Sequence, residues 1–181
     1  KRKRSFFIAS RNYKRNWRNK LKMKFARTIR FDKSDLNIFP LASEEGELAV
    51  VGTFSFYNIK PEDLKGKVKQ AFSNGFMGCS TFGYSTLVSL VNISEEELKI
   101  LKNKLGQCLI DNYGAPSKDV AEKAASEEIN FMLELCKDHD LGSLLSLSRD
   151  WSEEGIKEKF RNLPKADSCA EQKIWTVVEE D

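Results

Sequence analysis

The segment from Gly75 to Gly83 (GFMGCSTFG) gathers the residue types in this chain that could do chemistry: glycines, a cysteine and a serine. Glycines let a backbone approach a ligand closely. A phosphate-binding loop, however, runs from a strand into a helix, so that the helix N-terminus meets the anion. Here a predicted helix leads into a predicted strand, and no GK[ST] motif is present. We therefore interpret the segment first as a turn shaped by glycine, with Phe76 and Phe82 in the core.

The same segment is retained as a candidate ligand or partner loop. Its candidate residues are Gly75, Phe76, Gly78, Cys79, Ser80, Gly83 and Tyr84. Cys79 could act as a nucleophile only beside a base, which is usually a histidine. His139 is the single histidine, and its favoured place is the C-terminal end of a helix, where an imidazole suits the helix dipole. The sequence therefore nominates no catalytic residue.

The four cysteines do not form a metal-binding pattern. Cys79, Cys108, Cys136 and Cys169 lie far apart, without a CxxC pair. A zinc site needs ligands clustered in sequence or several histidines, and Cys136 with His139 would supply half a site. We expect no metal and no cofactor, and we expect reduced, partly buried thiols as in a reducing compartment.

Charged and aromatic residues elsewhere support weaker hypotheses. Glu127 and Glu128 lie on a predicted helix, where paired carboxylates could do acid–base work if Glu128 were buried, although a solvated face is favoured. Arg149 lies in a predicted strand, where we expect it to pair with a carboxylate or to cover apolar surface with its stem. Phe54 and Phe56 alternate as base-stacking aromatics on an open sheet do, but core positions are favoured.

The charge is divided between a basic arm and an acidic body. Residues 1–24 hold eleven Lys and Arg and no Asp or Glu, so 30 − 11 = 19 basic residues remain against 27 acidic ones, a net of −8. The arm could bind RNA, an acidic protein or an anionic membrane. It could also be a targeting segment, or sequence upstream of a start at Met23. The arm residues nominated for binding are Arg11, Lys14, Arg15, Arg18 and Lys20.

The apolar pattern predicts an α+β fold, in which one mixed or mainly antiparallel sheet is covered by about four helices. β-Branched and aromatic runs predict strands at 24–31, 47–57, 81–91, 144–149 and 173–179. Helical spacing predicts helices at 61–74, 94–113, 117–137 and 152–162. The order is β-β-α-β-α-α-β-α-β. We treat residues 1–22 as a basic N-terminal extension and residues 23–181 as one domain.

Local residues set the expected helix boundaries. Pro61 suits a first helical position, and Ser94 with Glu97 forms a capping box. Gly114 ends that helix, and the short loop that follows predicts an antiparallel helical hairpin. Ser152 is expected to cap the last helix.

Several segments of the body resemble a known family. They are MKFARTIRFDKSD from Met23, KVKQAFSNGFMGCSTFGYSTLV at 67–88, NYGAPS at 112–117, AASEEINFMLELC at 124–136 and EGIKEKFRNL at 154–163. Together they resemble a family of uncharacterised alphaproteobacterial proteins, a domain of unknown function, over roughly residues 23–163. Because the family begins near the position of Met23, the resemblance implies that residues 1–22 are an extension. It also implies a bacterial cytoplasmic protein, or a mitochondrial matrix protein in a eukaryote, and it carries no catalytic residues.

These features favour a non-enzymatic accessory or protein-interaction module. No apolar run approaches the roughly 20 residues of a membrane helix. One alternative is a small-ligand-binding protein or minor enzyme with its site at Gly75–Tyr84, which a pocket containing Cys79 with His139 or Arg149 would support. The other is an RNA- or ribosome-associated protein that binds through residues 1–24, since the net charge of the body argues against RNA binding elsewhere.

Overall fold

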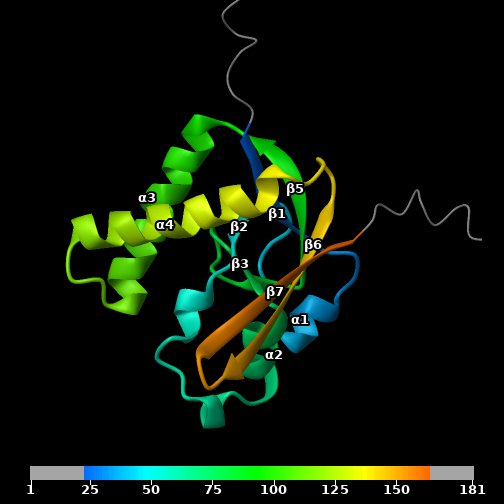
Figure 1. Cartoon of the computed structure of the whole chain (residues 1–181), viewed down its shortest axis with the longest axis vertical. Helices are drawn as coiled ribbons and strands as arrows, with labels where there is room; N and C mark the ends of the chain where they lie inside the picture. The colour runs from blue at the N-terminus through cyan, green and yellow to red at the C-terminus, as the bar shows by residue number, and fades with distance from the viewer. Residues whose placement is uncertain (1–22, 164–181) are drawn as a thin grey trace, which may run out of the picture.

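A computed structural model describes residues 23–163 of the chain (Figure 1). Its centre is a seven-stranded sheet in the order β4-β3-β2-β1-β5-β6-β7, in which every neighbouring pair is antiparallel. The strands are β1 (Met23–Ile29), β2 (Leu48–Val50), β3 (Phe76–Gly78), β4 (Tyr84–Ser85), β5 (Leu87–Ile93), β6 (Leu144–Ser152) and β7 (Gly155–Leu163). The helices are α1 (Ser34–Ile38), α2 (Gly66–Asn74), α3 (Glu95–Tyr113) and α4 (Lys118–Lys137), with 3₁₀ turns η1 (Thr53–Phe56) and η2 (Pro61–Asp63). The predicted α+β class and the mainly antiparallel sheet are confirmed, and the element order follows the prediction roughly.

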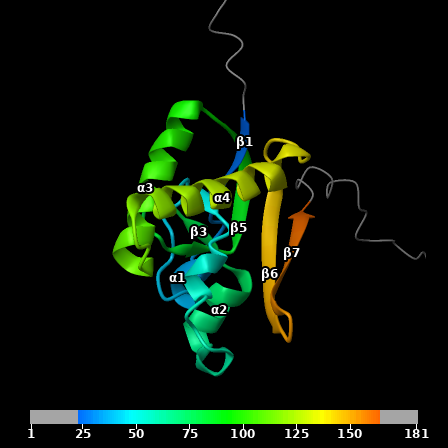
Figure 2. The same cartoon turned by 60° about the vertical axis from the view of Figure 1, so that its left-hand side comes forward.

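The helices lie to one side of β5, β6 and β7, as Figure 2 shows. The period of two in β6 explains this arrangement, because Leu145, Leu147 and Arg149 are buried while the residues between them stay partly exposed. Leu145 and Leu147 belong to the main core, which α3 and α4 cover. A second apolar cluster lies around α2 and consists of Phe39, Phe56, Leu64, Ala71 and Phe72.

The predicted boundaries of the two long helices are confirmed. Ser94 and Glu97 form the complete capping box at the start of α3. Gly114 ends α3 with a φ of 71°, in the left-handed region that favours glycine. Ser117 then caps α4 by accepting a hydrogen bond from the Val120 N–H. The two helices pack against each other, and α4 runs back obliquely across α3 in both views (Figures 1 and 2).

The predicted strand at 47–57 is shorter than expected. β2 ends at Val50, and Gly52 adopts a φ of 75° that turns the chain into η1. Phe54 and Phe56 therefore lie on a 3₁₀ turn and not on an open sheet. Phe56 is buried in the α2 cluster, and Phe54 packs edge-on against Tyr113 at 5.1 Å between ring centroids.

Two further boundaries differ from the prediction. Pro61 opens only the 3₁₀ turn η2, and α2 begins at Gly66 before it ends at Asn74 as expected. The predicted strand at 81–91 is divided into the short β4 and the longer β5.

The predicted helix at 152–162 is wrong, because these residues form the turn and second strand of a β-hairpin. β6 pairs with β7 from Leu144↔Leu163 to Ser152↔Gly155, and Glu153 and Glu154 form the turn. The Ser152 hydroxyl donates to the Gly155 carbonyl and closes that turn instead of capping a helix. The predicted strand at 173–179 and the basic arm at 1–22 lie outside the described residues.

Candidate functional site

Two glycines in the predicted Gly75–Tyr84 loop are required by close packing. A Cβ on Gly83 would lie 2.5 Å from the backbone carbonyl carbon and oxygen of Ala42. A Cβ on Gly78 would lie 2.6 Å from the Glu47 carboxylate and 2.8 Å from the Ser43 side chain. These glycines therefore let the loop pack against residues 42–47 of its own chain, which agrees with the interpretation of a glycine-shaped turn.

The Glu47 carboxylate holds the loop in place through hydrogen bonds. It accepts hydrogen bonds from the backbone N–H groups of Ser80 (2.7 Å), Thr81 (2.9 Å) and Glu44 (2.7 Å), and from the Thr81 hydroxyl (2.7 Å). Burial alone would raise the pKa of Glu47, but the hydrogen bonds from Thr81, Ser80 and Glu44 outweigh it and lower that pKa. Both carboxylate oxygens of Glu47 are therefore hydrogen-bonded to the protein itself and are not free for a ligand.

Three other residues of the predicted loop pack within the fold or hydrogen-bond to it. Phe76 is fully buried in the main core. Gly75 follows the C-terminus of α2, and the Tyr84 hydroxyl donates to the Ser55 hydroxyl at 3.2 Å. Of the seven predicted loop residues, Cys79 and Ser80 line a pocket.

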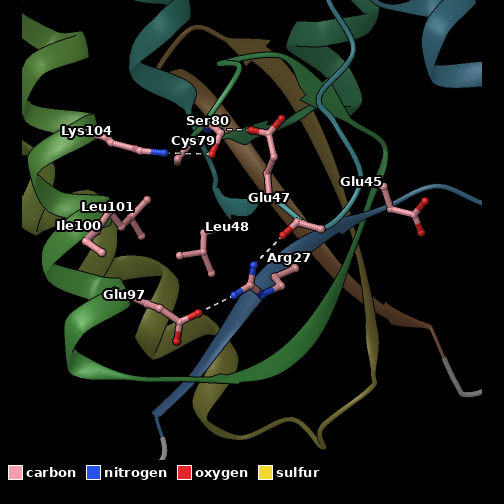
Figure 3. A pocket seen from close by; sticks show the side chains of 11 residues that line it. Arg27, Glu45, Glu47, Leu48, Cys79, Ser80, Glu97, Ile100, Leu101 and Lys104 are labelled. Atoms are coloured by element: carbon pink, nitrogen blue, oxygen red, sulfur yellow. Dashed lines mark hydrogen bonds and ion pairs between the residues drawn. The ribbon is translucent and has the colours of Figure 1, made fainter.

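This Cys79 pocket has a volume of about 290 Å³ and lies between α3 and the ends of β1, β2 and β3 (Figure 3). At one end, the Lys104 ammonium reaches toward the Ser80 hydroxyl at 3.4 Å. At the other end, Arg27 pairs with Glu97 at 2.6 Å. Leu48, Ile100 and Leu101 supply apolar walls between these ends, so the pocket has a polar rim at each end and an apolar centre.

The Cys79 pocket does not assemble a nucleophile with a base. Burial, followed by the nearby carboxylates Glu128 and Glu47, raises the pKa of the Cys79 thiol far above its ordinary value. Neither His139 nor Arg149 lines the pocket. The His139 Nδ1 instead lies 3.2 Å from Asn162 Nδ2. The pocket can therefore hold a small molecule, but its thiol is kept protonated.

Arg149 is the largest fully buried side chain in the described residues. It is ion-paired with a carboxylate, which was one of the two positions expected for it from the sequence. Its Nε donates to Glu158 Oε1 at 2.9 Å and to the Thr53 hydroxyl at 2.9 Å. Glu158 lies directly opposite on β7, because the register pairs Arg149 with Glu158. Burial lowers the pKa of Arg149, and the adjacent Glu158 opposes that effect.

The other end of the Arg149 guanidinium binds three backbone carbonyls. Nη1 donates to the carbonyls of Phe72 (2.9 Å) and Gly75 (3.0 Å) at the end of α2, and Nη2 donates to the carbonyl of Val51. The guanidinium also lies 5.6 Å from the centroid of the Phe56 ring. One side chain thus joins β6 to the end of β2 and to the C-terminus of α2.

A groove of about 610 Å³, larger than the Cys79 pocket, lies elsewhere in the described residues, and we call it the aromatic–acidic groove. It lies between η1, the middle of α4 and the turn end of the β6–β7 hairpin. Its lining residues are Val51, Thr53, Phe54, Tyr57, Leu109, Ala124, Glu127, Glu128, Phe131, Trp151, Gly155, Ile156 and Glu158. Tyr57 is 69 % exposed and Phe131 is 47 % exposed, so large aromatic surface faces the solvent here.

Every charged residue that lines the aromatic–acidic groove is a glutamate. Glu158 is neutralised by Arg149, whereas Glu128 accepts a hydrogen bond from the Gly52 N–H at 2.7 Å. Burial raises the pKa of Glu128, and the hydrogen bond from Gly52 opposes that effect. Glu127 is more exposed and lies 4.0 Å from Lys123 on the helix surface. The groove is therefore apolar with an acidic margin.

Trp151 lines the groove and also carries an unpaired donor. Its Nε1 is the buried side-chain nitrogen or oxygen that lacks a hydrogen-bond partner among residues 23–163. A buried N–H without an acceptor costs about 1–3 kcal/mol, but this nitrogen is shielded from solvent and is therefore not open to an occupant of the groove. The Trp151 ring itself stacks on Phe72 at 5.9 Å between centroids.

Sequence reasoning missed this groove because its walls come from three distant segments. It placed Glu128 on a helix as a candidate and considered Phe54, but it assigned the hairpin wall at 152–162 to a helix. Recognising Glu153–Gly155 as a hairpin turn would have placed Trp151 and Ile156 side by side, since the register pairs them.

Residues 23–163 contain no cluster of histidine, cysteine and carboxylate side chains suited to a metal ion. Within the same range, no helix has the length and apolar character to cross a membrane. Cys79, Cys108 and Cys136 are buried and unpaired.

Comparison with known proteins gives one match. A model of a family of unknown function, DUF6505, matches residues 23–179. No curated protein and no solved structure matches the chain. The match begins where the sequence resemblance placed the start of the body, at Met23, and it extends beyond the described residues. The chain therefore belongs to this family of unknown function, DUF6505.

Proposed function

We propose that the protein is a non-enzymatic interaction module whose aromatic–acidic groove binds a peptide segment of a partner protein. The segment carries a Lys or Arg next to a large apolar side chain. The observation that carries this proposal is the composition of the groove: exposed aromatic rings over an apolar floor, with glutamates as the charged lining residues.

The aromatic rings supply the affinity in this proposal. Aromatic residues are enriched where proteins bind one another, because they bury large area with little loss of side-chain entropy. Phe131 lies 6.0 Å from the Phe160 ring, which gives its exposed ring a firm base. A large apolar side chain of the partner would pack between Phe131 and Tyr57.

The glutamates supply the specificity in this proposal. A Lys or Arg of the partner would pair with Glu127 and approach Glu128, whereas an acidic segment would be repelled.

Selection from an unbiased displayed peptide library on the full-length protein tests this proposal. We expect enrichment of peptides with Lys or Arg beside Leu, Phe or Trp. The Phe131→Ser and Glu127→Lys variants should each weaken binding of the enriched peptides about tenfold or more, since one loses apolar area and the other reverses the local charge.

Phe31→Ser is the matched control, because Phe31 is 68 % exposed but does not line the groove. It should leave peptide binding unchanged. The proposal is wrong if no peptide is enriched, or if the enriched peptides bind the Phe131→Ser and Glu127→Lys variants as well as the wild type.

The alternative of a small-ligand site keeps one supporting observation, the Cys79 pocket. Lys104 and Ser80 at its rim would bind an anionic group, and Leu48, Ile100 and Leu101 would contact an apolar body. Ligand-dependent thermal shifts with short-chain carboxylates that disappear in Lys104→Met would favour this second function over peptide binding.

The RNA-binding alternative rests on residues 1–24, of which 1–22 lie outside the described part. We propose RNA binding only through that arm, and a salt titration of RNA binding tests it, because phosphate contacts by Lys and Arg give a steep dependence on salt.

We also propose that the protein is located in the cytoplasm of alphaproteobacteria. The family resemblance and the buried, unpaired thiols support this location.

A further inference from the structure

β7 forms one edge of the sheet and also borders the aromatic–acidic groove. It spans Gly155–Leu163 and, among residues 23–163, it pairs with β6 alone (Figure 2). Its residues Gly155, Ile156 and Glu158 line the groove. The open edge of a strand presents a row of backbone donors and acceptors that can pair with another strand.

The hairpin register identifies which backbone groups of β7 face outward. In a hairpin with a two-residue turn, the pair that flanks the turn exchanges both hydrogen bonds, and such pairs recur at every second residue. The flanking pair here is Ser152 and Gly155. The residues of β7 whose backbone N–H and C=O point away from β6 are therefore Ile156, Glu158, Phe160 and Asn162. The first two of these also line the groove, so a peptide beside them could pair with the backbone and fill the groove at once.

The face of β7 toward the groove suits apolar and basic side chains. Phe160 is only partly buried, and the half-exposed Phe131 ring lies 6.0 Å from it. The charge of Glu158 on this face is balanced by Arg149, whereas Glu127 on α4 is exposed. Alternate side chains of a strand beside β7 would point to this same face.

The opposite face of β7 is basic. Lys157, Lys159 and Arg161 are exposed and share this face, because they alternate along the strand. Lys157 is paired with Glu154 at 2.8 Å. Lys159 and Arg161 instead lie opposite serines of β6 and have no carboxylate partner among the described residues. An acidic side chain of a neighbouring strand would be favoured beside these two cations.

We propose that the partner peptide binds as an added strand on the β7 edge and carries the pattern apolar–acidic–basic, read in either direction. The large apolar residue and the Lys or Arg lie next to each other on the groove face, two positions apart in sequence, against Phe131 and Glu127. The acidic residue between them points to the opposite face, beside Lys159 and Arg161. The pattern carries one charge of each sign, so it is not the acidic segment that the glutamates of the groove repel. This inference rests on the proposed function, because it describes how the groove holds its peptide.

Backbone N-methylation of a library-selected peptide tests the strand pairing. Peptides with one N-methyl group at a time are titrated into the full-length protein. An added strand directs only every second peptide N–H toward β7. Methylation at those positions should weaken binding about tenfold or more, and methylation at the positions between them should leave it nearly unchanged.

Amide hydrogen exchange of the full-length protein, resolved by residue with NMR, tests the same pairing from the side of β7. The outward-facing amides are those of Ile156, Glu158, Phe160 and Asn162. We expect them to exchange rapidly in the free protein and about tenfold or more slowly at saturating peptide.

A second library selection tests the charge pattern. On the Lys159→Glu/Arg161→Glu variant, the residue between the apolar and the basic positions should change from Asp or Glu to Lys or Arg. The matched control is Lys99→Glu/Lys118→Glu, which makes the same change in net charge at exposed positions of α3 and α4. It should keep the acidic residue.

The outcomes separate this inference from the proposed function. Selected peptides that depend on Phe131 and Glu127 but show no alternation in the N-methyl series would leave the groove proposal standing and overturn strand addition. Slow exchange of the four amides in the free protein, or exchange unaffected by peptide, would also overturn it. An acidic position that both charge variants keep, or both lose, would overturn the charge pattern. If no peptide is enriched, both proposals are wrong.

Discussion

Arg149 should be the single side chain whose loss most weakens this fold. Arg149→Met keeps the length of the stem but removes the charge and every donor. The substitution leaves Glu158 without its counter-ion and the carbonyls of Phe72, Gly75 and Val51 without their donor. Breaking a buried ion pair by removing one partner costs about 3–5 kcal/mol. The unsatisfied carbonyls keep the expected loss toward the upper end of that range, because each unpaired buried acceptor costs about 1–3 kcal/mol and such costs do not add fully.

Urea denaturation followed by circular dichroism measures this loss. Because a domain has a free energy of unfolding of about 5–15 kcal/mol, the variant should unfold at a much lower urea concentration. The double variant Arg149→Met/Glu158→Leu should recover part of the loss, since it also removes the uncompensated carboxylate. A loss below about 1 kcal/mol for Arg149→Met, or no recovery in the double variant, would refute this reasoning.

Three further predictions follow from the loop and the buried thiol. Gly83→Ala should lower the free energy of unfolding by about 1–3 kcal/mol in urea denaturation, because its Cβ would lie 2.5 Å from the Ala42 backbone; an unchanged midpoint would contradict the packing. Glu47→Gln should destabilise the protein by about 2–4 kcal/mol at pH 7. Since the folded state lowers the pKa of Glu47 below its ordinary value of 4.5, its carboxylate stabilises the protein above about that pH, and this stabilisation disappears as the pH falls through the folded pKa. Urea denaturation at pH 7 and pH 3 should therefore show a smaller difference between wild type and Glu47→Gln at pH 3, and a difference that grows toward acid would be contrary evidence. Cys79 should react with a thiol reagent at pH 8 only under unfolding conditions, because burial raises its pKa; peptide mapping that finds rapid labelling of native Cys79 would disprove this.

Local rules predicted the two long helices well. The Ser94–Glu97 capping box and the Gly114 stop depend on neighbours within a few residues, so the sequence contains all the information that sets those ends. The same holds for Ser117, whose hydroxyl caps α4. How α3 and α4 cross was not predictable in this way, because helix crossing depends on packing with the rest of the core.

The hairpin was missed because its pattern is ambiguous. Ile156 and Phe160 are four residues apart, a spacing that places two side chains on one face of either a helix or a strand. Glu158 lies between them on the same strand face and breaks the apolar pattern in the sequence. In the structure its charge is balanced by Arg149, which lies opposite on β6. Only the pairing of the two strands shows that this glutamate is neutralised.

The candidate site was predictable in part. The sequence indicated a glycine-shaped turn at Gly75–Tyr84, and the close approach of Gly83 to Ala42 agrees with it. It gave no indication that Glu47, far from the loop in sequence, would bind the loop backbone. The aromatic–acidic groove was beyond reach for the same reason, since η1, α4 and the hairpin meet only in the folded chain.

The most direct test of the interaction proposal is site-specific photo-cross-linking from the groove. A benzophenone amino acid replaces Phe131 in the full-length protein, and another replaces Phe31 as the exposed aromatic control outside the groove. After irradiation in native lysate, mass spectrometry identifies the cross-linked partner peptide. We predict that position 131 captures a segment with Lys or Arg beside a large apolar residue, that Glu127→Lys abolishes the product, and that position 31 does not form it. A product from position 131 that is acidic, or that forms equally from position 31 or with Glu127→Lys, would contradict the proposal, as would the absence of any product.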